Sequence, residues 1–353
     1  MDFGFVFFGN VQVASVVALA ERRGFTHAWL YDSQMLTGDV YAALALCAAQ
    51  TKKIRLGPGV TNPMSRIAPL TASAIATINV LAPGRTILGI GTGNTARRTL
   101  GMPAARLDVL REHVRICRDL LAGKTTAYQE GDRRRMIRFL HAPGAVDGRK
   151  IPIYVSASGP KTLELAGEIA DGVILFGTVS PSLIRFCMDH IRTGAERAGR
   201  DPRKIYTLCM TAFHLTQPGE KLESARVRRA VGPFVSSSSN IFAYSCPNPE
   251  DLPADLRDDL VAFKGAYKTA DEPIETRHLK LYSQYLRGFR KEHEPLVTEK
   301  MIRATTLTGS RDEILESIRS MKKAGIRQVA IQPIVDPRET VERFAKHIIR
   351  RWR

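Results

Sequence analysis

The chain has 353 residues, too many for one small domain but suited to a large α/β barrel with insertions. Its composition, 44% hydrophobic and 25% charged, is that of a globular protein. The net charge of +17 favours anionic partners, but the basic residues are scattered and form no nucleic-acid-binding motif, so we expect an anionic small molecule or a plain basic surface, and no nucleic acid.

Cysteine spacing and the first residues add two further expectations. The five cysteines are far apart and show no spacing typical of a zinc or redox motif, so we expect a reduced, cytoplasmic protein without a metal. The stretch MDFGFVFFGN has no basic leader, and its apolar run is too short for a signal peptide or a membrane span. We therefore expect no membrane association and predict a first strand over residues 3–8.

Short apolar runs alternate with helical patterns along the whole chain. Strands are predicted over 3–8, 27–31, 54–60, 86–90, 153–156, 173–176, 205–215 and 328–334. Helices are predicted over 11–23, 40–50, 68–81, 104–121, 161–170, 182–198 and 340–350. Such alternation implies parallel strands joined by right-handed crossovers, and eight strands predict an α/β fold of the (β/α)8 TIM-barrel type, with 1–353 as a single domain.

A doubly wound sheet is the competing architecture. Its dinucleotide-binding form needs a G-x-G-x-x-G fingerprint after the first strand. Here the first strand ends in FFGN, and the glycine-rich GIGTGN at 89–94 follows the fourth strand with a different spacing. The barrel is therefore the preferred prediction.

The alternation loosens between residues 232 and 300. This stretch contains a serine run, several prolines and the aromatics Phe234, Phe242, Tyr244, Tyr282 and Tyr285. A long segment between two strands is usually functional, so we predict that 232–300 is an insertion between strands 7 and 8 that covers the barrel mouth as a lid. A disordered surface insertion is the alternative.

Small and amide-bearing residues follow the predicted strands, where a barrel gathers its chemistry. Asp32 is the one acid that directly follows a strand, and no lysine or His/Asp cluster suggests a Schiff base or a metal. Such a mouth suits a large flat cofactor that brings its own chemistry, although each residue alone is also an ordinary turn residue. The strand ends carry Gly9, Asn10, Tyr31, Asp32, Ser33, Gly59, Val60, Thr61, Asn62, Gly91, Thr92, Gly93, Asn94, Ser156, Ala157, Ser158, Gly159, Pro160, Phe176, Gly177, Thr178 and His214.

The segment VYAALALCAAQTKKIRLGPGVTNPMSRIAPLTASAIATINVLAPGRTILGIGTG, residues 40–93, resembles the bacterial luciferase-like flavin and deazaflavin oxidoreductases. Within this family it is most similar to the methylenetetrahydromethanopterin reductase branch. Three further segments agree: LGMPAARLDVLREHVRICRDLLAG, IPIYVSASGPKTLELAGEIADGVILFG and TGSRDEILESIRSMKKAGIRQVAIQP. The resemblance implies a TIM barrel, a hydride-transferring enzyme, and either the deazaflavin coenzyme F420 or FMN.

The resemblance also implies where the ring of the coenzyme lies. It implies a non-prolyl cis peptide bond between Gly59 and Val60 that presses on the ring. Asp32 is implied at the ring end as a catalytic group, but the next residue is Ser33, where many members have histidine; a solvated helix-capping aspartate is the alternative. The cofactor-binding residues expected here are Asp32, Gly59, Val60, Thr61, Asn62, Thr92, Gly93 and Asn94.

The stretch SASGPKT precedes a predicted helix, whose first N–H groups lack partners within the helix and attract anions. Together with the resemblance, this predicts the coenzyme phosphate at Ser158, Gly159 and Pro160, joined by Gly177 and Thr178 from the next strand. An ordinary helix start with proline in the first turn is the alternative.

His278 begins the helical stretch HLKLYSQY in the insertion. We predict that it faces the substrate as a second catalytic residue, with Tyr282 one turn further along; a surface histidine is the alternative.

The preferred function is an F420-dependent oxidoreductase that moves a hydride between the coenzyme and a small organic substrate. The alternative is an FMN-dependent monooxygenase that receives reduced flavin from a separate reductase and uses oxygen. A non-enzymatic flavin-binding protein is the third possibility. The expected partners are a small-molecule substrate, a flavin or F420 reductase, and a second copy of the chain in a homodimer.

Overall fold

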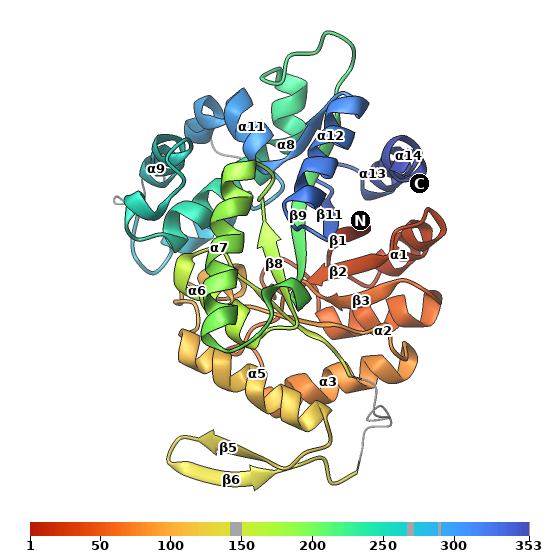
Figure 1. Cartoon of the computed structure of the whole chain (residues 1–353), viewed down its shortest axis with the longest axis vertical. Helices are drawn as coiled ribbons and strands as arrows, with labels where there is room; N and C mark the ends of the chain where they lie inside the picture. Colours follow the sequence, from red (N-terminus) through yellow and green to blue (C-terminus); the bar gives the residue numbers. More distant parts are fainter. Residues whose placement is uncertain (142–149, 267–271, 289–290, 353) are drawn as a thin grey trace.

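The computed structural model describes residues 1–141, 150–266, 272–288 and 291–352, and in this part of the chain eight parallel strands form a central barrel (Figure 1). The strands are β1 (Asp2–Phe8), β2 (His27–Tyr31), β3 (Arg55–Pro58), β4 (Leu88–Ile90), β7 (Ile153–Ser156), β8 (Gly172–Phe176), β9 (Tyr206–Leu215) and β11 (Gln328–Gln332). Each corresponds to a predicted strand, so the predicted TIM barrel is confirmed.

Hydrogen bonds between the strands set the order β3-β2-β1-β11-β9-β8-β7-β4. The two ends of this order meet, because parallel bridges pair Leu56 with Thr86 and Thr61 with Ile90. One short additional strand, β10 (Leu307–Gly309), extends the sheet by pairing with the carboxyl end of β9. All strands of the barrel run in the same direction, so their carboxyl ends gather at one face.

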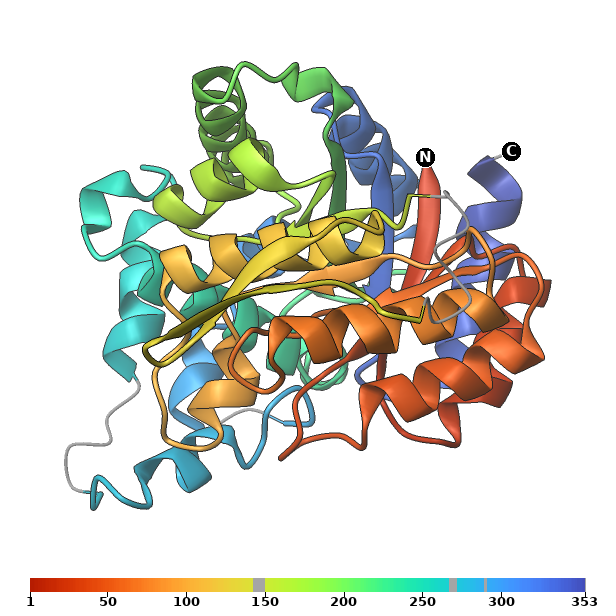
Figure 2. The same ribbon diagram turned by 90° about the horizontal axis from the view of Figure 1, so that it is seen from below.

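Helices cover the outside of the barrel (Figures 1 and 2). Side-chain caps fix several helix starts: the Asp39 carboxylate accepts hydrogen bonds from two N–H groups of α2, and Ser310 and Glu313 form a capping box on α12. The covering helices are α1 (Val13–Arg22), α2 (Val40–Gln50), α3 (Ala68–Leu81), α5 (Leu107–Leu121), α6 (Pro160–Ile169), α7 (Pro181–Arg197), α12 (Arg311–Lys323), α13 (Pro337–Phe344) and α14 (Arg350–Trp352).

A two-stranded hairpin, β5 (Thr126–Glu130) and β6 (Arg133–Ile137), was not predicted. It lies beside α5 at the edge of the molecule (Figures 1 and 2). Arg115 of α5 holds it there by donating to the Thr126 hydroxyl and the Ala127 carbonyl. The hairpin therefore lies outside the barrel, on the outer side of α5.

The region predicted as an insertion is largely helical. The expectation that the pattern loosens at residue 232 is wrong, because Gly232, Pro233 and the serine run lie inside the 21-residue helix α8. Serine and proline have low helix propensity, but burial of this helix overrides that local preference. Residues 267–271 and 289–290 of the predicted insertion lie outside the described residues. The helices of this region are α8 (Ala225–Ser245), α9 (Arg257–Ala266), α10 (Arg277–Tyr282), a 3-10 helix (Lys291–Leu296) and α11 (Glu299–Thr305).

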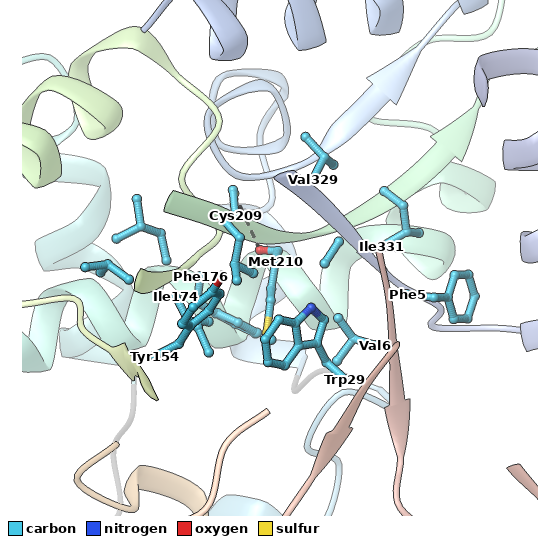
Figure 3. Packing of buried hydrophobic residues seen from close by; sticks show 14 of the residues in the cluster. Phe5, Val6, Trp29, Tyr154, Ile174, Phe176, Cys209, Met210, Val329 and Ile331 are labelled. Carbon is cyan, nitrogen blue, oxygen red and sulfur yellow. Dashed lines mark hydrogen bonds between the residues drawn. The ribbon is translucent and has the colours of Figure 1, made fainter. Parts of the chain in front are cut away.

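Large side chains fill the barrel interior (Figure 3). Trp29 of β2 is buried, and its indole Nε1 donates to the Gln328 side-chain oxygen on β11 at 3.1 Å. Met210 of β9 extends toward Trp29 in the same view. These side chains form the floor beneath the carboxyl ends of the strands.

Candidate active site

A cavity opens at the carboxyl ends of the barrel strands. Its wall comes from the ends of β2, β3, β4, β7 and β8, from α4 (Asn94–Arg98) and from α8. Of the residues predicted to bind the coenzyme, the cavity is lined by Asp32, Gly59, Val60, Thr92, Gly93, Asn94 and Ser158. Residues from four predicted strand ends therefore meet in one place.

The end of β3 contains the expected bulge. The peptide bond between Gly59 and Val60 is cis, as predicted. A Cβ added to Gly59 would lie 2.9 Å from the Trp29 Cβ and 3.0 Å from the Met210 Cε, so a side chain here would collide with the barrel floor. A Cβ at Gly91 would lie 3.0 Å from Val60 Cγ2. Glycine at both positions leaves Val60 as the apolar surface exposed to the cavity.

Asp32 is a buried carboxyl group at the cavity edge. It is 7% exposed, and its Oδ2 accepts a hydrogen bond from the Thr61 hydroxyl at 2.7 Å. Burial raises the pKa of Asp32, and this outweighs the Thr61 hydrogen bond and the Arg66 charge, which lower it. A carboxyl group with a raised pKa is suited to hold or release a proton near a reacting centre. Thr61 does not line the cavity but orients Asp32.

Asn62 shapes the loop after β3 instead of lining the cavity. Its side-chain oxygen accepts hydrogen bonds from the backbone N–H groups of Met64 and Ser65. Gly93, with a φ of 84°, packs against it, since an added Cβ would lie 2.9 Å from Asn62 Cβ. Asn62 thus supports the turn that carries Thr92, Gly93 and Asn94 to the cavity.

The predicted phosphate loop lies at the start of α6, beside α8. Ser158 lines the cavity, and Pro160 occupies the first turn of α6. Gly159 faces α8, because a Cβ there would lie 2.2 Å from the Ser245 carbonyl oxygen. The first N–H groups of α6 have no partner within the helix and remain suited to an anion.

Gly177 and Thr178 are placed differently from the prediction, and neither lines the cavity. Gly177 has a φ of 63°, and a Cβ there would lie 2.3 Å from Ser238 Cβ of α8. Thr178 is fully buried, and its carbonyl accepts a hydrogen bond from the Cys209 thiol. The sequence could not show this because α8, which covers both residues, was not predicted.

His278 also lies apart from the coenzyme cavity. It lines a separate surface pocket with Phe8, Met35, Thr99 and Tyr282. A Cβ added to Gly101 would lie 2.9 Å from its Nδ1. The predicted substrate-facing role of His278 stays a prediction, since this pocket shares Tyr285 with the cavity that Asp32 lines.

Several cavity residues were not assigned to the site from the sequence. From α8 come Ile241 and Ser245, one helical turn apart, and from the segment after α10 comes Tyr285. Tyr31, whose buried hydroxyl has no hydrogen-bond partner among the described residues, lines the same cavity. The spacing of four residues between Ile241 and Ser245 could have predicted that they share one side of a helix. That prediction requires knowing that the serine run is helical.

A second cavity adjoins the first. It lies between α8 and a wall formed by residues 281–288 and His293. It shares Asn94, Arg98, Ile241, Ser245 and Tyr285 with the coenzyme cavity. Tyr244 and Tyr282 line it, as expected for aromatics that pack over a pocket. The two cavities therefore have a common wall.

Two kinds of feature are absent from the part of the chain that the structure describes. No helix there is long and apolar enough to span a membrane. In the same ranges, no three His, Cys, Asp or Glu side chains gather as a metal site.

The chain is similar to known oxidoreductases. The model of the luciferase-like monooxygenase family matches residues 11–328. The 5,10-methylenetetrahydromethanopterin reductase of Archaeoglobus fulgidus is 31% identical, and the alignment covers 99% of both chains. The F420-dependent glucose-6-phosphate dehydrogenase of Nakamurella multipartita is 32% identical over 57% of this chain and 62% of that protein. The fold is also that of the coenzyme F420-dependent tetrahydromethanopterin reductase from Methanopyrus kandleri, with a TM-score of 0.73, 24% identity, and coverage of 100% of this chain and 99% of that chain.

Proposed function

Because the chain belongs to the luciferase-like monooxygenase family and is an oxidoreductase of that class, we propose that it transfers a hydride between coenzyme F420 and a small organic substrate. The observation that carries this proposal is the cavity at the strand ends, lined by small residues and one buried acid. Such a site binds and orients a cofactor that supplies the chemistry itself.

The residues of this cavity fit a flat tricyclic ring. Val60 presents an apolar surface, and Gly91 leaves the space beside it open. When bound, reduced F420 would supply the hydride. Asp32 would hold a proton at the ring end, since burial raises the pKa of its carboxyl group. Ser158 and the first N–H groups of α6 would hold the phosphate.

F420 is proposed in preference to FMN on two grounds. Relatives that are 31% and 32% identical are named as a methanopterin reductase and as an F420-dependent dehydrogenase. The net charge of +17 also suits the anionic tail of F420. The first substrate to test is 5,10-methylenetetrahydromethanopterin, because the relative that aligns over almost the whole chain is named for it.

The same proposal includes the surroundings of the enzyme. The five cysteines are free and buried, which supports a reducing compartment such as the cytoplasm. A separate enzyme that reduces F420 would regenerate the coenzyme between turnovers.

Two measurements test the proposal. The purified protein is titrated with F420 and with FMN, followed by fluorescence, and we expect tight binding of F420 and weak binding of FMN. Reduced F420 is then mixed with the protein and 5,10-methylenetetrahydromethanopterin in the absence of oxygen. We expect the reduced F420 to be oxidised. Oxygen uptake that depends on added substrate in the presence of reduced FMN, together with no F420 binding, would instead support the monooxygenase alternative.

A further inference from the structure

The second cavity contains a linked set of buried polar side chains on one face of α8. Ser236, Asn240 and Tyr244 follow one another at a spacing of four residues, so they lie along the same side of the helix. Ser236 is 4% exposed and Asn240 is 7% exposed. Polar groups buried to this degree are normally bonded within the protein or to a ligand.

His293 lies directly beside this stripe and lines the same cavity. Its Nδ1 and the Ser236 hydroxyl oxygen lie 2.6 Å apart and share a hydrogen bond. The imidazole is 1% exposed, and its ring also packs edge-on against Phe263 of α9, with the centroids 5.9 Å apart. Both contacts hold the imidazole in one orientation at the cavity wall.

Asn240 completes the set. Its side-chain N–H donates to the Ser236 carbonyl at 2.8 Å. Because a carbonyl can only accept, this bond fixes the orientation of the amide and assigns the other atom as the oxygen. That oxygen, Oδ1, is buried and has no hydrogen-bond partner among the described residues. It is therefore an acceptor in need of a donor.

We infer that this cavity binds the substrate, that Asn240 orients it through a hydrogen bond, and that His293 holds the Ser236 side chain beside Asn240. The inference rests on the proposed function and adds the specificity-determining residues. Asn240 Oδ1 accepts from an N–H or O–H group of the substrate, so the enzyme selects a substrate that carries such a donor on a flat portion able to pack against Tyr244 and Tyr282. The shared wall at Ile241 and Tyr285 places that molecule beside the coenzyme cavity.

A site built to bond a donor discriminates strongly against molecules that lack it, because its own polar groups are then left unpaired. His293 lines the cavity that shares five residues with the coenzyme cavity, whereas the pocket at His278 shares only Tyr285 with it.

The serine run provides a matched control for the test. Ser239 lies on the same helix and is fully buried, but it lines neither cavity. Ser236→Ala, Asn240→Ala and Ser239→Ala are compared with the unmodified protein. KM and kcat are measured with reduced F420 and 5,10-methylenetetrahydromethanopterin. Substrate binding to the F420-loaded protein is measured by calorimetry, and F420 affinity and Tm are measured alongside.

We expect Ser236→Ala and Asn240→Ala to raise KM and weaken calorimetric substrate binding about tenfold, which corresponds to ~1.4 kcal/mol. F420 affinity should stay within about twofold, and Ser239→Ala should change neither quantity. The inference is overturned if all three variants behave alike, or if the loss falls on F420 affinity. A different result would refute the proposed function, and the inference with it: the unmodified protein binds F420 but does not oxidise reduced F420 when substrate is added.

Discussion

Asp32 shows how burial alone can give a common residue a special property. Its carboxyl group lies at the edge of the coenzyme cavity with one oxygen bonded to Thr61. Ionisation is disfavoured in the folded protein because burial removes water from the carboxylate, and the pKa is raised. The folded state thus binds this proton more tightly than the unfolded chain does.

The sign of the resulting stability change follows from linkage. The carboxyl group favours folding below its unfolded pKa, near 3.8, and this advantage is lost as the pH rises through the raised folded value. Asp32→Asn has no group that titrates at this position. The Tm of the variant minus the Tm of the unmodified protein should therefore become larger as the pH rises from 3 to 7. Each unit of pKa elevation corresponds to about 1.4 kcal/mol of folding free energy.

Turnover should respond in the opposite direction. We expect Asp32→Asn to lower the rate of F420-dependent hydride transfer more than tenfold, about 1.4 kcal/mol, because the amide cannot hold the transferable proton. Thermal melts and steady-state rates on the same preparation check both effects. A variant that melts lower at pH 7 and retains full turnover would make Asp32 a structural residue.

Among the elements, α8 contributes most to turning the barrel mouth into a site. It lines both cavities and packs on the barrel through ring contact between Phe234 and Phe176, with centroids 4.6 Å apart. Two glycines allow its close approach: Gly177 lies against Ser238, and Gly159 lies against the Ser245 carbonyl. Space at these two glycines sets how near α8 comes to the strand ends.

Gly159→Ala tests this role. The backbone of Gly159 is extended and suits any residue, so the added methyl group acts only by colliding with the Ser245 carbonyl. We expect displacement of the last turn of α8, a lower Tm, and at least tenfold weaker F420 binding, about 1.4 kcal/mol. Gly265→Ala in α9 is the control, because no atom lies within 4 Å of its added Cβ.

The two interpretations of Gly159 predict different combinations of results. A loss of F420 affinity at unchanged Tm would show that the loop itself approaches the phosphate, as the sequence suggested. A joint loss of Tm and affinity would indicate that α8 docking is what the glycine permits.

At the scale of the whole molecule, the net charge of +17 should influence coenzyme binding. Arg98 is exposed and lines both cavities, and its guanidinium lies 5.9 Å from the Tyr244 ring centroid. Exposed charges are screened beyond about 10 Å at 0.1 M salt. F420 affinity should therefore fall as salt rises, and Arg98→Gln should reduce the slope. Titrations at several salt concentrations measure this, and a flat profile would contradict it.

The outer surface of α2 and α3 indicates how the predicted homodimer could form. Neither helix contains a charged residue, and Leu70 and Leu81 of α3 are 49% and 47% exposed. The solvent-facing side of a surface helix normally carries charged and polar residues, and here large apolar side chains are exposed on it instead. We expect a second copy to cover this face, so that the double substitution Leu70→Glu and Leu81→Glu yields monomers.

Light scattering on the purified protein would measure that change. Val261→Glu, at an exposed apolar position of α9, is the matched control and should leave the dimer intact. A monomeric unmodified protein would refute the homodimer.

The sequence by itself determined the barrel, because its signals are local. Each of these signals depends on near neighbours in the chain: strand alternation, helix periodicity, and the glycines and prolines of residues 57–63. Together they placed all eight strands of the barrel within a few residues. Resemblance over 40–93 was specific enough to predict the cis bond at Gly59–Val60. The acid at the end of β2 could also be identified from its position alone.

Only the tertiary structure decided which residues share the mouth. The serine run has weak helix propensity, and its burial against the barrel, which no local pattern records, makes it helical. Contacts such as Ser236 with His293, 57 positions apart in the chain, depend on that packing. The same packing placed α8 over Gly177, because proximity across a fold is set by how helices dock and not by sequence spacing.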